Sequence, residues 1–155
     1  MKTIWSWSYE QEAKRIAYAC ANIANGFYAQ QGYTILPSGT PTHQPTTTIY
    51  LPDLNYSSIP RFWETVSKVD FKQTQPLKDS LISPIIPALV SRLILSGITP
   101  EPTHPIESIW TKYSTKILNE LCSITGFKLK DINSITIHPT RYGSNGSFDI
   151  VNSLP

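Results

Sequence analysis

Apolar side chains recur at spacings of three and four residues near the start of the chain, between Ala13 and Tyr28. This periodicity is that of an α-helix with one buried face. Ser8 and Gln11 precede it with the spacing of a capping box, and Gly32 follows it as a suitable left-handed C-terminal cap. The sequence therefore predicts a long amphipathic helix from Ser8 to Gly32, whose many alanines allow another element to approach closely.

Shorter patterns predict the remaining elements. Alternating or β-branched runs indicate strands over residues 4–9, 33–36 and 46–51, and two more within residues 134–151. Helices are expected over residues 57–69, 83–96 and 104–126, with a linker at residues 72–76. The first strand carries an aromatic stripe that is expected to face the core: Trp5, Trp7 and Tyr9. The last helix has its apolar side chains on one face: Ile106, Ile109, Trp110, Tyr113, Ile117, Leu121 and Ile124.

The order of these elements places strands at both ends of the chain and helices between them. The regular strand–helix alternation of a doubly wound fold is missing. We therefore expect an α+β fold with two layers, in which about four helices pack mainly on one face of a mostly antiparallel sheet of about 4–5 short strands. With 155 residues, the chain is expected to form one domain over residues 1–155.

The chain has few charges. Charged residues make up 15% of the sequence and the formal net charge is +2, whereas soluble domains contain about 25% charged residues. A surface built largely from uncharged polar side chains favours contact with a second copy or another subunit. Lys and Arg are not clustered, which argues against nucleic-acid binding, because affinity for nucleic acid comes from neutralising phosphates.

Cys20 and Cys122 are the only cysteines, and each falls on the apolar side of an expected helix. Two cysteines do not make a disulfide framework, so a reducing, cytoplasmic location is expected. Charged residues interrupt any early apolar stretch that could act as a signal peptide. The longest apolar-rich region, Leu81 to Ile98, contains two prolines and an arginine and is not expected to cross a membrane.

Chemically useful side chains gather near the C-terminus, within an expected hairpin. His138 is a candidate base, Asp149 its orienting carboxylate, Arg141 an anion clamp and Tyr142 a hydrogen-bond donor. A two-residue Asn145-Gly146 turn would place Tyr142 opposite Asp149, whereas a four-residue turn would place Thr140 there. The alternative interpretation is structural: Arg141 and Asp149 form a surface ion pair, and His138 ends a strand.

No cofactor or metal is expected. The glycine patterns of nucleotide-binding sites are absent. All three histidines, His43, His104 and His138, lie beside prolines, and three imidazoles on stiff loops could bind zinc. Nothing in their spacing requires this, so we predict no metal.

The sequence alone leaves two functions open. The first is a small soluble binding or assembly protein without catalysis of its own, which self-associates or joins a larger complex through protein contacts. The alternative is a small hydrolase or transferase that acts on an anionic small molecule through His138, Arg141 and Asp149.

Overall fold

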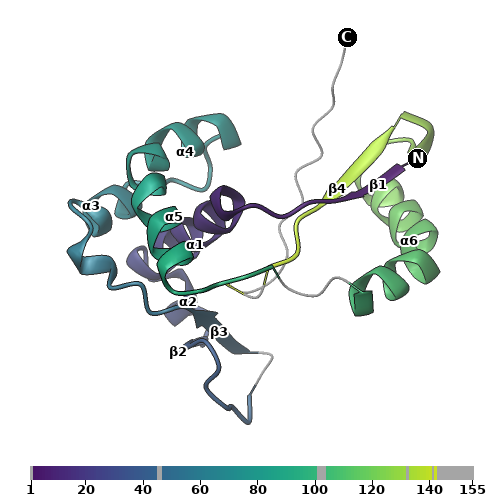
Figure 1. The fold of residues 1–155 in the computed structure, drawn as a ribbon. Coiled ribbons are helices and arrows are strands. Elements are labelled where there is room, and N and C mark those ends of the chain that lie inside the picture. The colour runs from purple at the N-terminus through teal and green to yellow at the C-terminus, as the bar shows by residue number, and fades with distance from the viewer. Residues whose placement is uncertain (1, 45–46, 101–103, 132, 141, 143–155) are drawn as a thin grey trace. The chain divides into compact units, whose positions relative to one another are not determined.

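The computed structural model divides the chain into two compact units (Figure 1). The described residues of unit 1 are 2–7, 100, 104–131 and 133–139, and those of unit 2 are 8–44, 47–99, 140 and 142. That residues 1–155 form a single domain stays a prediction.

Unit 2 begins with α1 (Tyr9–Ala24), and its start is as predicted. The Ser8 hydroxyl accepts a hydrogen bond from the Gln11 backbone N–H at 3.2 Å, which satisfies one of the free donors of the first turn. The predicted continuation to Gly32 is wrong. Gly26 adopts a left-handed conformation with φ +72° and ends the helical path, so residues Phe27–Gln30 form a separate short helix, α2.

Further helices complete unit 2: α3 (Phe62–Ser67), α4 (Gln75–Ile82) and α5 (Ile86–Leu95), with 3₁₀ turns η2 (Tyr56–Ser58) and η3 (Ser83–Ile85). The sequence missed α4, because its Pro76 suggested a linker. Proline is tolerated in the first helical turn, where its missing N–H would have no partner. The predicted end of α5 is correct, since Gly97 follows it with φ +67°.

The core of unit 2 forms around α1, which packs against α5 and α3. Ala13, Ala17 and Ala21 on α1 are fully buried. Their small side chains allow the neighbouring helices to approach the α1 backbone. Phe62, Leu89 and Leu93 are among the largest buried side chains of the partner helices, and burying one such side chain contributes about 1.5–3 kcal/mol.

The predicted sheet is wrong. In the described residues, β2 (Thr34–Pro37) pairs in parallel with β3 (Thr48–Leu51), and β1 (Lys2–Trp5) pairs in parallel with β4 (Ser134–Ile137). Over the described ranges the fold is α+β with two two-stranded parallel sheets, not a mostly antiparallel sheet of 4–5 strands. Side-chain alternation is the same in parallel and antiparallel strands, so the pattern that identified the strands did not contain their direction.

Unit 1 consists of β1, β4, the long helix α6 (His104–Thr125) and a 3₁₀ turn η4 (Leu129–Asp131). The expected alternation in β4 is present, with Ile135 and Ile137 half-buried between exposed neighbours. The first strand is shorter than predicted, because Tyr9 already belongs to α1. Of the helices in the described ranges, none combines the length and apolar composition that a bilayer crossing requires.

Candidate functional site

The structure describes two of the four residues predicted to form a catalytic cluster. His138 follows β4 in unit 1; its side chain is exposed, with Nδ1 3.1 Å from the Ser6 carbonyl oxygen. Tyr142 belongs to the core of unit 2. Arg141 and Asp149 lie outside the described residues. The cluster and the hairpin register therefore stay predictions.

Tyr142 is held by backbone contacts to α1. The Arg15 side chain donates from Nε to the Tyr142 carbonyl oxygen at 3.3 Å. The Tyr142 N–H donates to the Thr140 hydroxyl at 3.1 Å, and this hydroxyl donates to the buried carboxylate of Glu12. These contacts fix the Tyr142 backbone, and its side chain is 3% exposed within the core of unit 2.

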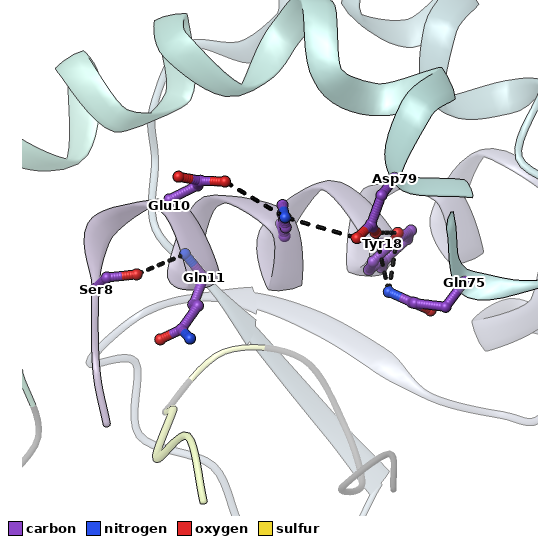
Figure 2. A network of polar contacts seen from close by, with 7 residues as sticks. Ser8, Glu10, Gln11, Tyr18, Gln75 and Asp79 are labelled. Carbon is purple, nitrogen blue, oxygen red and sulfur yellow. Dashed lines mark hydrogen bonds and ion pairs between the residues drawn. The ribbon is translucent and has the colours of Figure 1, made fainter. Parts of the chain in front are cut away.

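A second polar cluster joins α1 to α4 (Figure 2). The Tyr18 hydroxyl donates to Asp79 Oδ1, and Gln75 Nε2 donates to the same oxygen at 2.9 Å and to the Tyr18 oxygen at 3.2 Å. Lys14 Nζ lies 3.6 Å from Asp79 Oδ2. Both carboxylate oxygens of Asp79 are thus engaged by neighbours within the protein. We assign this cluster a structural role in positioning α4 on α1.

No metal centre emerges from the described part of the chain, where no group of three or more His, Cys, Asp or Glu side chains converges. His43 is exposed in the loop between β2 and β3.

Cys20 provides a test of thiol chemistry. Burial raises the pKa of its thiol to about 12, so this thiol stays protonated and unreactive at neutral pH. We expect the Cys122→Ser variant, which retains only Cys20, to react with dithiobis(nitrobenzoate) at pH 8 only as fast as the protein unfolds. The Cys20→Ser variant should react without unfolding, because Cys122 is only partly buried. Equal rates for the two folded variants would contradict this prediction.

The most prominent surface feature is an apolar row on α6 in unit 1. We call it the α6 apolar face, and it consists of Ile106, Ile109, Tyr113, Ile117, Leu121 and Ile124. All of these except the half-buried Leu121 are exposed, and Ile109 is 58% exposed. Five of them, together with Lys116 and Glu120, line an open hollow of about 400 Å³. Water-exposed apolar side chains gathered in this way are typical of an interaction surface.

The orientation of α6 follows from the side next to the α6 apolar face. Leu118 is buried, and Trp110 Nε1 donates to the Thr3 hydroxyl of β1 at 2.9 Å. Figure 1 shows α6 beside β1 and β4. The sequence placed Trp110 among the residues of one apolar face and did not single out Leu118. Because helical periodicity shows which residues share a face but not what covers it, the exposure of the row required the structure.

Comparison of the chain with protein-family models, with curated proteins and with solved structures gives no match. A function for this chain therefore has to be inferred from the chemistry of the described side chains.

Proposed function

We propose that this protein is a small assembly protein without catalysis of its own, and that it self-associates through the α6 apolar face. The exposed row of large apolar side chains on one helix is the observation that supports this function. The low content of charged residues, 15%, supports it as well, since such a surface repels a second copy only weakly. We also propose a cytoplasmic location, in keeping with the two free cysteines, Cys20 and Cys122.

The occupant that fits the row best is a second copy of α6 in the opposite direction. A twofold contact requires a surface that is complementary to itself. If two α6 helices pack antiparallel about a point midway between Tyr113 and Ile117, these two residues face each other across the contact. In the same register Ile109 faces Leu121, and Ile106 faces Ile124. Every member of the α6 apolar face then has an apolar partner in the other copy.

The charges beside the row support the same register. A twofold axis brings equivalent flanks of the two helices together, and Lys112 and Glu120 lie on the same flank of α6. In the register described above, Glu120 of one copy comes within about two residues of the level of Lys112 of the other. Two such pairs of opposite charge form in each dimer and favour this register, whereas Lys116 on the same flank lies near Lys116 of the other copy and opposes it.

Size-exclusion chromatography with light scattering tests this function. At tens of micromolar, the wild-type chain should have twice the monomer mass of 17.4 kDa. Ile109→Glu should be monomeric, with the dissociation constant raised at least about a hundredfold, because each dimer would bury two unpaired carboxylates. Leu77→Glu on α4 is a matched control, since Leu77 is 59% exposed and Ile109 is 58% exposed. This control should remain dimeric.

A charge exchange tests the register separately. Lys112→Glu should weaken the dimer, and Lys112→Glu combined with Glu120→Lys should restore it. A monomeric wild-type chain would contradict the proposed function. So would a dimer that Ile109→Glu and Leu77→Glu affect equally. A monomeric wild type that Ile109→Glu destabilises would show instead that the α6 apolar face is covered within one chain.

A further inference from the structure

Unit 2 contains a hollow of about 390 Å³ that is separate from the α6 apolar face. Three segments and Tyr142 form it. The segments are Pro37 and Ser38 after β2, Pro52 and Asp53 after β3, and residues 96–99 after α5. Because β2 and β3 are parallel, their carboxyl ends meet at the same edge. The carboxyl edge of parallel strands is a common place for ligands, since the following loops converge there.

Four of the backbone N–H groups around this hollow are already used: those of Ser38, Ser96, Gly97 and Ile98. The Ser38 N–H donates to the Leu51 carbonyl at 2.9 Å. Gly97 and Ile98 donate to Ile94 at 3.0 Å and Leu93 at 3.2 Å, which is the Schellman pattern at the end of α5. The Ser96 N–H donates to the Arg92 carbonyl at 2.9 Å. Pro37 and Pro52 have no N–H. A ligand that needs backbone N–H donors, such as a phosphate or a carboxylate, finds none at these six positions.

The hydrogen-bond acceptors around the hollow, in contrast, can still bind a ligand. Asp53 is exposed, and its Oδ1 accepts the Asn55 N–H at 3.2 Å, so the carboxylate can accept further bonds. The C-terminal end of α5, which carries the negative end of the helix dipole, adjoins the same hollow. Among the described residues, no Lys, Arg or His side chain lines the hollow or forms an ion pair with Asp53. The described lining thus offers several acceptors, one carboxylate and no cationic side chain.

From this imbalance we infer that the hollow binds a small organic ammonium ion with a short alkyl chain. The ammonium N–H groups donate to the Asp53 carboxylate, and the hydroxyls of Ser38, Ser96 and Thr99 offer further acceptors. Pro37, Pro52 and Ile98 supply apolar surface for the alkyl chain.

Titration with butylammonium chloride, followed by amide chemical shifts in ¹⁵N-labelled protein, tests this inference. Shifts should concentrate at residues 38, 53–55 and 96–99, with a dissociation constant on the order of 1 mM. Sodium butyrate has the same alkyl chain with the opposite charge, and tetramethylammonium has the charge without an N–H donor. Neither should bind there at the same concentration.

Asp53→Asn tests the contribution of the carboxylate. Asn keeps the acceptor for the Asn55 N–H but removes the charge, so binding should weaken about tenfold or more. Asp70→Asn is the matched control, because Asp70 is also exposed and accepts a backbone N–H two residues on, from Lys72 at 2.9 Å. Equal effects of the two variants would overturn the inference. Equal binding of butyrate or tetramethylammonium by the wild type would overturn it without any variant.

Discussion

Replacement of Phe62 by Ala is expected to lower the free energy of unfolding by about 3–5 kcal/mol. Phe62 is 1% exposed, and its ring centroid lies 5.2 Å from those of both Tyr56 and Trp63. Removing the ring leaves a cavity between α3 and the rest of the core and removes these aromatic contacts. Urea unfolding followed by circular dichroism measures the change.

The neighbouring residue provides the control for this variant. Trp63 is the larger aromatic residue but is 37% exposed, so part of its surface gains nothing from folding. Trp63→Ala should therefore cost less than Phe62→Ala, although more atoms are removed. If Trp63→Ala proved the more destabilising variant, the assignment of Phe62 as the buried centre of α3 would be wrong.

Replacement of Arg92 by Met is expected to lower the free energy of unfolding by about 2–3 kcal/mol. Arg92 on α5 donates from Nη1 to the Leu54 and Asn55 carbonyl oxygens at 2.7 and 3.2 Å, and from Nη2 to the Ser58 hydroxyl at 2.6 Å. The guanidinium thus ties the loop before α3 to α5. Asn55 in this loop has a left-handed backbone conformation with φ +50°. Such a conformation costs free energy, so the hydrogen bonds from Arg92 help to hold the loop in place.

Two further variants identify the cause of the Arg92 effect. Arg92→Lys keeps the charge but lacks the planar fork that reaches several acceptors at once, so it should be almost as destabilised as Arg92→Met. Lys68→Met removes an exposed cation whose Nζ lies 2.8 Å from Glu64 Oε1, and it should stay close to wild type. If Arg92→Lys restored full stability in urea unfolding, charge rather than hydrogen-bond geometry would be responsible.

Local patterns in the sequence predicted the positions of many elements better than they predicted how the strands pair. The Ser8 cap, the end of α5 before Gly97 and both ends of α6 depend on contacts within a few residues, which periodicity and capping preferences describe well. Strand pairing depends on the path of the chain between the strands. The pairing of β2 with β3 and of β1 with β4 could not be derived from alternation alone.

The two candidate sites also differ in how far the sequence predicts them. The α6 apolar face is visible in the sequence, because its residues share one helical spacing, but its exposure depends on which side of α6 meets β1. The hollow at Asp53 has no sequence signature at all. Its residues come from three separate segments and Tyr142, and the cation inferred for it follows from the Asp53 carboxylate and from the bonds already made by the N–H groups of Ser38, Ser96, Gly97 and Ile98.

The parallel pairing of β1 with β4 also affects biosynthesis. The contact between Ser6 and His138 joins residues 132 positions apart. On a ribosome, β1 therefore emerges long before its partner exists and spends that interval as an unpaired strand edge, while α1 to α5 can already assemble. Closing so large a loop is slow compared with helix formation. Unit 1 thus cannot be completed before β4 has been made, and until then the unpaired edge of β1 is open to aggregation.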